Sequence, residues 1–277
     1  MCRRYLFILF VTLAFHANGQ YYYRDILANR QTQRIWKSYY ANKVAKVDIQ
    51  SLESNGEPTP GFTCNQTVSR DFRTVETFTQ STRVQASDLQ TRYDESGRVV
   101  ETVDSSDTYK STTDYTYDAA GNLILVVNRA LETDNQLEAV ESHYWYYEHN
   151  RPVRMVKIKG KSDTTIVVFK SDDKGNIVQE TATHRGDVIP DIYYYYDDQG
   201  RLTDVVRYNE KAARLLPDYM FEYGAYGIAS MLYVPPGSSA YQKWIYDYDQ
   251  RGLKTAETCY NKKKEILGRM TFQYTLR

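Results

Sequence analysis

The sequence has no excess charge of either sign and no long internal apolar run. It contains 35 basic and 35 acidic residues among 277. A protein that binds nucleic acid needs a Lys/Arg excess to meet phosphate, so this balance argues against a nucleic-acid partner. After the first 19 residues, no segment approaches the roughly 20 apolar residues of a transmembrane helix. We therefore expect no transmembrane segment in the mature chain.

The short motifs of common enzymes and metal sites are also missing. There is no GxSxG, GxGxxG, GxxxxGK[ST], HExxH or CxxC. His143, His149 and His184 lack metal-site spacing, and we interpret each as structural. Acidic clusters such as Asp104 to Asp107 fall in predicted turns and connectors, which explains them without Ca²⁺. We predict a non-enzyme with no catalytic residues, cofactor or metal; a hydrolase using paired carboxylates from distant strands is the alternative.

Residues 1–19 have the features of a secretory signal peptide. Arg3 and Arg4 form a positive start, Leu6 to Phe15 an apolar segment, and Ala17-Asn18-Gly19 a small-residue cleavage site. No cysteine follows the cleavage site, so a lipid anchor is not indicated. We expect a mature chain that begins at Gln20 and is periplasmic or secreted.

Cysteine is scarce, and Cys2 would leave with the signal peptide. Cys64 and Cys259 would remain, and an oxidising compartment would allow them to pair. In a linear array of strands about 4.8 Å apart, however, they would lie tens of ångströms from each other. We therefore favour two isolated buried thiols over a disulfide.

Tyrosine is abundant, with 27 residues, and much of it belongs to an internal repeat. Seven segments share a pattern related to Tyr-Asp-x-x-Gly-Arg/Asn-Leu and recur every 24 to 30 residues. The tyrosines that anchor them are Tyr93, Tyr117, Tyr147, Tyr196, Tyr223 and Tyr248, and Ser171 takes this place in one segment.

Each repeat predicts a β-hairpin. The Asp after the anchor opens a turn by accepting backbone hydrogen bonds, and the glycine supplies a positive φ at its end. These glycines are Gly97, Gly121, Gly175, Gly200 and Gly252. Aromatic and apolar residues alternate before each turn and β-branched runs follow it, as in paired strands. We expect an all-β fold, a long curled antiparallel sheet of tandem hairpins over 87–277 with an aromatic ladder on one face.

The opposite face of the same strands changes along the chain. Early repeats place polar residues there, whereas the middle repeats place Tyr144, Tyr146, Tyr193 and Tyr195 there. Either the sheet curls so that this second face is buried, or the tyrosines form an exposed patch that binds a partner or ligand. A transmembrane barrel has the same hairpin period, but Asp204 and Arg207 put charge on both faces of one strand.

Residues 20–86 precede the repeats and form a predicted N-terminal capping region. Arg24 to Tyr40 shows the apolar stripe of a helix, and we expect this helix to cover one exposed edge of the array. Val44 to Leu52, Phe62 to Val68 and Val75 to Phe78 are predicted strands.

The repeat motif resembles the YD repeats of Rhs proteins and teneurins from residue 87 to about 276. It departs from them at Arg151-Pro152, Ser171 and Gly224. The resemblance implies a β-hairpin array that winds into a shell, which in large members encloses a C-terminal toxin. The sequence contains no Asp-Pro-x-Gly autocleavage motif, so we do not expect a toxin shell here. In overall form the chain is also similar to small envelope proteins, such as the periplasmic plug of a type IX secretion pore.

We therefore expect a non-enzymatic repeat protein that binds a cell-envelope partner protein, such as a subunit of an outer-membrane or secretion complex. Its contact residues would be Tyr144, Tyr146, Tyr193 and Tyr195, because buried tyrosine often dominates interface energy. The alternative is a carbohydrate-binding or adhesion module in which the same tyrosines stack on sugar rings.

Overall fold

The computed structural model describes residues 21–82, 85–132, 134, 136–209, 212–235, 238 and 240–277. The predicted signal peptide lies outside these residues. In the described part, helix α1 (Arg24–Ala41) is followed by an all-antiparallel sheet of 18 strands. The strands are β1 (Val44–Glu53), β2 (Thr63–Val68), β3 (Thr74–Gln80), β4 (Ser87–Tyr93), β5 (Val99–Ser106), β6 (Tyr109–Tyr117), β7 (Leu123–Glu132), β8 (Leu137–Glu148), β9 (Arg151–Lys159), β10 (Asp163–Ser171), β11 (Ile177–His184), β12 (Asp187–Tyr196), β13 (Leu202–Asn209), β14 (Arg214–Gly224), β15 (Gly227–Tyr233), β16 (Gln242–Tyr248), β17 (Lys254–Asn261) and β18 (Ile266–Leu276).

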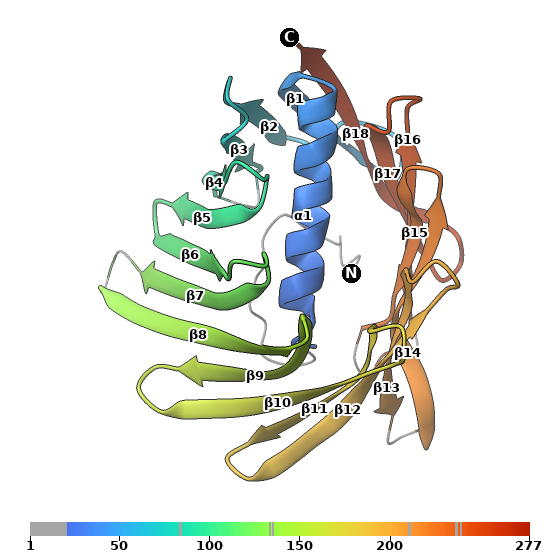
Figure 1. Cartoon of the computed structure of the whole chain (residues 1–277). Helices are drawn as coiled ribbons and strands as arrows, with labels where there is room; N and C mark the ends of the chain where they lie inside the picture. Colours follow the sequence, from blue (N-terminus) through green and yellow to red (C-terminus); the bar gives the residue numbers. More distant parts are fainter. Residues whose placement is uncertain are drawn as a thin grey trace.

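The sheet closes on itself, so the expectation of a merely curled sheet was incomplete. Each strand pairs with its sequence neighbours, and β1 pairs with β18 as well as with β2. The β1–β18 register runs from Val44 opposite Leu276 to Glu53 opposite Gly268. The first and last strands of the described chain therefore complete a barrel around α1 (Figure 1). The predicted strands of the N-terminal region, β1–β3, belong to the same sheet as the repeats.

The repeat motif forms its turns through contacts within five residues. In the first repeat the Gly97 N–H donates to the Asp94 carbonyl at 3.0 Å, and Gly97 has φ +74°. One Asp94 carboxylate oxygen accepts from the backbone N–H groups of Ser96 and Arg98, and the other accepts from Arg98 Nε at 2.6 Å. Asn122 bonds Asp118 in the same way in the next repeat. The motif therefore alternates Arg and Asn because both donate to the same carboxylate.

The anchor tyrosines tie each turn to the strand before it. The Tyr117 hydroxyl donates to the Val99 carbonyl at 2.7 Å, and the Tyr147 hydroxyl donates to the Leu123 carbonyl at 2.9 Å. The same bond recurs from Tyr196 to Ile177, Tyr223 to Leu202, Tyr248 to Ile228 and Tyr274 to Lys254. Each of these partly buried tyrosines thus satisfies its hydroxyl group with a backbone carbonyl. A phenylalanine at the same position would leave that carbonyl without this hydrogen bond.

The departures from the motif change the turn and keep the hairpin. Glu148 pairs directly with Arg151, and the two residues between them, His149 and Asn150, have φ +49° and +60°. This geometry matches a two-residue turn with two positive φ angles. Strands β8 and β9 therefore pair as expected without the Asp and Gly of the motif.

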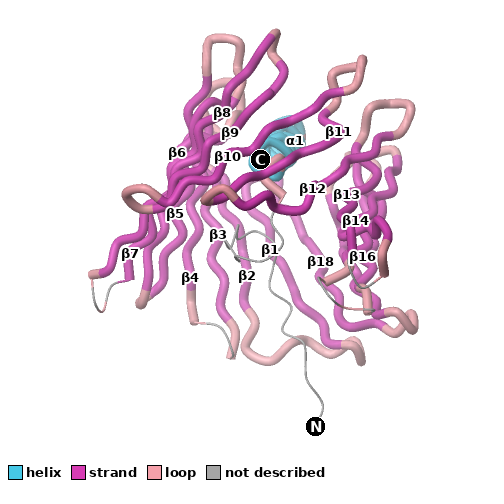
Figure 2. The backbone as a smooth tube through the Cα atoms, turned by 90° about the horizontal axis from the view of Figure 1, so that it is seen from below, coloured by secondary structure: helices cyan, strands magenta, loops and turns pink. Residues whose placement is uncertain are grey.

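Helix α1 lies inside the barrel and does not cover an exposed edge, so that prediction was wrong (Figures 1 and 2). The β1–β18 pairing removes the edge that the helix was expected to protect. The C-terminal half of α1 contacts the short turns: Trp36 Nε1 donates to the Phe72 carbonyl at 2.6 Å, and Ser38 Oγ lies 3.5 Å from the Gly252 carbonyl. Among the described residues, no helix combines the length and apolar content needed to cross a membrane.

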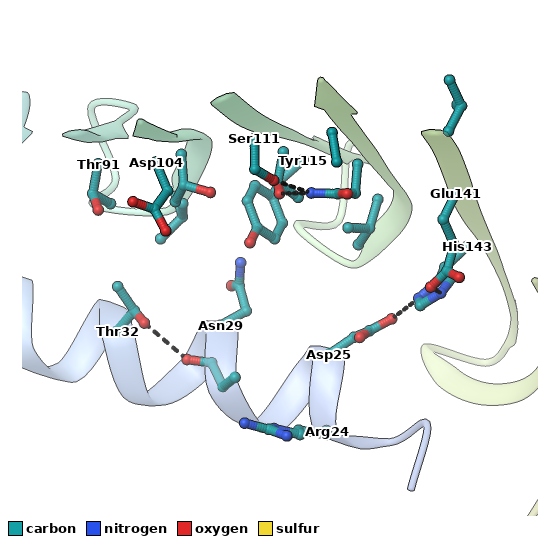
Figure 3. Close-up of a pocket in the computed structure, with 18 of the residues that line it drawn as sticks. Arg24, Asp25, Asn29, Thr32, Thr91, Asp104, Ser111, Tyr115, Glu141 and His143 are labelled. Atoms are coloured by element: carbon teal, nitrogen blue, oxygen red, sulfur yellow. Dashed lines mark hydrogen bonds and ion pairs between the residues drawn. The ribbon is translucent and has the colours of Figure 1, made fainter. Parts of the chain in front are cut away.

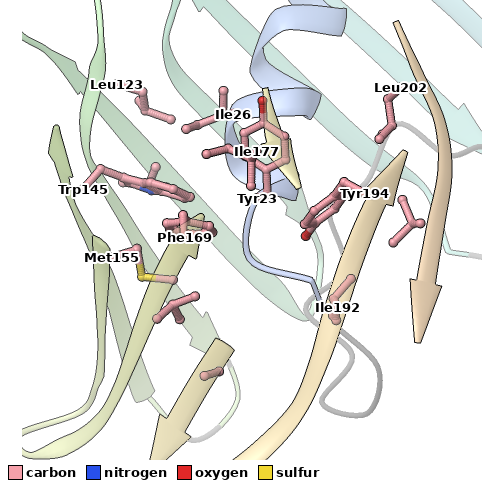
Figure 4. Close-up of a cluster of buried hydrophobic side chains, with 14 residues drawn as sticks. Tyr23, Ile26, Leu123, Trp145, Met155, Phe169, Ile177, Ile192, Tyr194 and Leu202 are labelled. Carbon is pink, nitrogen blue, oxygen red and sulfur yellow. The ribbon is translucent and has the colours of Figure 1, made fainter. Parts of the chain in front are cut away.

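Two apolar cores hold the helix to the wall. Tyr23 and Ile26 pack at its N-terminal end against the inner face of β7–β13, where the rings of Trp145 and Phe169 stack at 5.2 Å (Figure 4). Tyr39 packs at the other end against β1–β5, β18 and Leu253. The predicted aromatic ladder therefore faces inward and forms much of the core.

Closure also corrects the argument about the cysteines. Cys64 on β2 lies opposite Ile49 of β1, and Cys259 on β17 lies opposite Gly268 of β18. Because β1 and β18 are paired, only two strands separate β2 from β17, which places these strands roughly 14 Å apart at the usual spacing. Gly268 lies opposite Glu53, four residues from Ile49, so the two cysteines are also offset along the strands and lie roughly 19 Å apart. Both cysteines are free and buried, as predicted, and they remain well beyond disulfide distance, although two strands separate them and not the whole array.

Candidate functional site

A cavity of about 540 Å³ lies between α1 and the inner face of β4–β8. Figure 3 shows Asp25 and Asn29 on the helix side and Asp104, Ser111 and Tyr115 on the strand side. The cavity exists because inward positions here carry small side chains, including Thr113, Ala130 and Ala139.

One end of the cavity holds a chain of paired charges. His143 Nδ1 lies 2.6 Å from Asp25 Oδ2, and His143 Nε2 lies 3.0 Å from Glu141 Oε1. Lys157 Nζ lies 2.9 Å from the other Glu141 oxygen, and Trp145 Nε1 donates to Asp25 Oδ2 at 3.2 Å. Burial lowers the pKa of His143, but the carboxylates of Asp25 and Glu141 outweigh it and raise this pKa to about 9. The histidine is therefore a buried cation that fixes the helix to β8, which agrees with its predicted structural role.

The other end of the cavity is lined by hydroxyl and amide groups. Asn128 Nδ2 donates to Ser111 Oγ at 2.9 Å and to Thr113 Oγ1 at 2.8 Å. The Tyr109 hydroxyl donates to Asp104 Oδ2 at 2.6 Å. Asp104 Oδ1 is buried, and in the described part of the chain it has no hydrogen-bond partner. Such an acceptor is uncommon in native proteins, and it indicates a place where a bound group could donate.

A second buried acid anchors the segment before the helix. Glu180 accepts hydrogen bonds from the backbone N–H groups of Tyr22 and Tyr23 at 2.9 and 3.0 Å and from the Tyr194 hydroxyl at 2.7 Å. Burial raises the pKa of Glu180 to about 7, although these three donors favour the charged form. All of its contacts are internal, so we interpret Glu180 as a structural residue.

Sequence reasoning missed the acidic groups of the interior, namely Asp25, Asp104, Glu141 and Glu180. A signal was present for one of them: Glu141 lies two residues before His143 and therefore on the same, inward face of the strand. His184 was also predicted to be structural, and its Nε2 lies 2.7 Å from Asp163 Oδ1. Within the described residues, no group of three or more His, Cys, Asp and Glu side chains is placed to hold a metal ion.

The predicted contact tyrosines lie on the outer surface of the barrel. Tyr144, Tyr146 and Tyr195 are 38%, 42% and 48% exposed, and Tyr193 is half-buried. The sheet therefore curls with the anchor tyrosines inside and this second face outside, which is the exposed alternative of the two considered.

The structure divides these four tyrosines between two patches. Two rows of paired residues cross strands β8, β9 and β10 on this outer face. One row contains Tyr144, Val156 and Ile166, and the other contains Tyr146, Arg154 and Val168. We call Tyr144, Tyr146, Val156, Ile166 and Val168 the Tyr144 patch. On β11 the outward Gln179 and Thr181 bond Asp191, and this polar strip separates the patch from Tyr193 and Tyr195.

Comparison with known proteins identifies the repeat. Residues 93–131 match the family model described as RHS Repeat, and no curated protein matches the chain. A porin-like protein from Bacteroides uniformis matches with a TM-score of 0.40 and 11% identity, over 85% of this chain and 97% of that one. A protein of unknown function from the DUF3598 family of Nostoc punctiforme matches with a TM-score of 0.17 and 10% identity, over 86% and 97% of the two chains. The chain thus carries the Rhs repeat, in the hairpins anchored by Tyr93 and Tyr117.

Proposed function

We propose that this protein is a non-enzymatic, periplasmic or secreted component of the cell envelope that binds a partner protein through the Tyr144 patch. The observation that carries the proposal is the exposure of apolar side chains on three adjacent strands. Ile166 and Val168 are 45% and 49% exposed, beside Tyr144 and Tyr146. Contiguous exposed apolar surface of this kind is typical of interaction sites.

The chemistry of the patch supports a protein partner. Tyrosine and arginine are the residues most often found at interface hot spots, and the Arg154 guanidinium lies 4.2 Å from the centre of the Tyr146 ring. The partner should therefore offer an apolar surface with an acidic group opposite Arg154. The outer face of the earlier strands differs, because it carries ion pairs such as Arg92–Glu101 and Asp114–Arg129.

Three features support the envelope location and the absence of catalysis. Residues 1–19 have the composition of a signal peptide, and residues 93–131 carry the Rhs repeat. Both ring nitrogens of His143, the histidine in the cavity, are bonded to carboxylates. A histidine bound in this way has no free nitrogen to act as a general base.

The test replaces the two tyrosines of the Tyr144 patch, as Tyr144→Ser with Tyr146→Ser, and in a fourfold variant also the two predicted contact residues outside it, as Tyr193→Ser and Tyr195→Ser. Each protein is used to capture partners from the native envelope, and the captured proteins are identified by mass spectrometry. The matched control is Tyr208→Ser with Tyr226→Ser, since these tyrosines are 49% and 52% exposed outside the patch. We expect both variants to fold and to lose partners that the control retains. An unchanged set of partners in the double variant would refute the proposal, even if the fourfold variant loses them.

A further inference from the structure

We propose that the cavity between α1 and β4–β8 binds a small neutral carbohydrate, a mono- or disaccharide, through Asp104 and the hydroxyl groups of β6. This site is distinct from the Tyr144 patch, which lies on the outer surface of the barrel. Its volume of about 540 Å³ falls within the range of small-molecule sites, about 300–1,000 Å³.

The first reason is the free acceptor on Asp104. Its Oδ2 accepts from the Tyr109 hydroxyl, whereas its buried Oδ1 has no partner among the described residues. The register places Asp104 opposite Leu89 on β4 and opposite Ser111 on β6, both of which line the cavity. An O–H or N–H donor in the cavity would supply the missing bond and remove the cost of an unsatisfied buried carboxylate oxygen.

The second reason is that the hydroxyl groups beside Asp104 require a ligand that also accepts hydrogen bonds. Ser111 Oγ and Thr113 Oγ1 both accept from Asn128 Nδ2, and no acceptor for either hydroxyl proton is found in the described part. A sugar hydroxyl both donates and accepts hydrogen bonds. Neighbouring hydroxyls of one sugar ring could therefore donate to Asp104 and accept from Ser111 and Thr113. An ammonium group only donates, and it would leave the protons of Ser111 and Thr113 unmatched.

The charges around the cavity disfavour an anion. Asp25, His143, Glu141 and Lys157 are paired with one another, and Asp104 is the cavity carboxylate whose buried oxygen has no partner among the described residues. Of the remaining cations that line the cavity, Lys159 is exposed, and Arg24 lies on the opposite side of α1 from Asp104 (Figure 3). An anionic ligand beside Asp104 would meet a like charge, whereas a neutral one would not.

The cavity also offers apolar surface for the C–H face of a sugar ring. Leu89, Val126, Ala130 and Val140 line it together with the ring of Tyr115. Asp104, Ala130 and Ala139 lie within a few residues of the connections after β5 and β7, at the end of the barrel opposite the repeat turns. A ligand would therefore enter from that end, since α1 occupies the turn end.

The experiment is calorimetric titration of the full mature chain with glucose, N-acetylglucosamine, maltose and chitobiose, and with putrescine as an amine probe. We expect at least one saccharide to bind and Asp104→Asn to weaken it about tenfold or more. Asparagine can still accept from Tyr109, but it presents an N–H₂ group in place of the free oxygen. The matched control is Asp114→Asn, because Asp114 lies on the outer face of the neighbouring strand and pairs with Arg129. This control should bind like the wild type.

A second variant obstructs the mouth of the cavity, so that the test does not depend on one substitution. Ala139→Phe adds a ring to the cavity wall and should abolish saccharide binding while the Tyr144 patch keeps its partners. The proposal is overturned if no saccharide binds the wild type, if only putrescine binds, or if binding survives both Asp104→Asn and Ala139→Phe. Saccharide binding that is lost in the fourfold tyrosine variant and kept in these two would also overturn it, because the sugar would then lie on the outer face.

Discussion

The contact between helix α1 and the first repeat turn leads to a prediction that separates backbone strain from packing. A Cβ added at Gly97 would lie 2.6 Å from Trp36 Cδ2 and closer still to Cε3 and Cζ3 of the same ring. Gly121 holds the same position in the next repeat, with φ +86°, and its added Cβ would meet only the flexible end of Arg98 at 3.3 Å. Gly97→Ala and Gly121→Ala therefore share the strain of a positive φ and differ in the helix contact.

The structure sets the size of the two effects. A non-glycine residue in the left-handed region costs roughly 1–2 kcal/mol, which is the whole cost expected for Gly121→Ala. Gly97→Ala should also displace Trp36 from its packing; truncating a fully buried tryptophan costs about 3–5 kcal/mol, and the partly buried Trp36 should cost less than this. Trp36 Nε1 would in addition lose its hydrogen bond to the Phe72 carbonyl, worth about 1 kcal/mol. We expect Gly97→Ala to lower the free energy of unfolding by about 3 kcal/mol or more, clearly beyond the cost of Gly121→Ala.

The assay is equilibrium unfolding in urea, followed by circular dichroism and by tryptophan fluorescence; coincident transitions would justify a two-state treatment. A double-mutant cycle with Trp36→Ala isolates the contact, because the smaller side chain leaves room for the new Cβ. After Trp36→Ala, adding Gly97→Ala should cost only the backbone term of about 1–2 kcal/mol. Equal costs for Gly97→Ala and Gly121→Ala, or a strictly additive cycle, would show that α1 does not rest on this turn.

Three further predictions concern the interior. Tyr147→Phe should cost about 1 kcal/mol in urea unfolding, because it removes the bond to the Leu123 carbonyl, and Tyr208→Phe on the outer face should cost little. Burial raises the pKa of Glu180 from 4.5 to about 7. The contribution of Glu180 to the free energy of unfolding is therefore full below pH 4.5, and about 3 kcal/mol of it is lost as the pH rises through 7. Thermal unfolding should show this loss, and Glu180→Gln should lack that part of the pH dependence. Burial and the nearby Glu257 carboxylate raise the pKa of Cys259 to about 12, so a thiol reagent at neutral pH should label it only after denaturation; rapid labelling of the native protein would contradict its burial.

The hairpins could be predicted because their turns depend on neighbouring residues. Asp94, Gly97 and Arg98 form their hydrogen bonds within one turn, and the same spacing recurs along the chain. Period-two alternation then places the anchor tyrosines on one face of each strand. Both signals are local, which is why the strands and an aromatic ladder on one face of the sheet were predicted from the sequence.

Closure and the position of the helix could not be predicted in this way. The pairing of Val44 with Leu276 joins the first and last strands of the sheet, and it depends on curvature accumulated over the whole sheet. The apolar stripe of α1 predicts a face that packs against the sheet, but Ile35 and Tyr40 on this stripe are 44% and 56% exposed. The helix also contacts the wall through polar residues. Asp25 bonds His143, and Asn29 Nδ2 lies 2.6 Å from the Tyr117 hydroxyl. Those partners are remote in sequence, so only the assembled barrel brings them together.

The cavity follows from an imbalance between the two halves of the wall. On the β7–β13 side, Trp145, Phe169 and Tyr194 fill the space beside Tyr23, whereas on the β4–β8 side Ser111, Thr113 and Ala130 leave it open. Within the described part of the chain, the Tyr144 patch is on the outside of β8–β10, so most of it overlies the filled half. Substitutions in the Tyr144 patch should therefore leave the cavity intact, and substitutions of cavity-lining residues should leave the patch intact. This separation is what allows the two proposed binding surfaces to be tested independently.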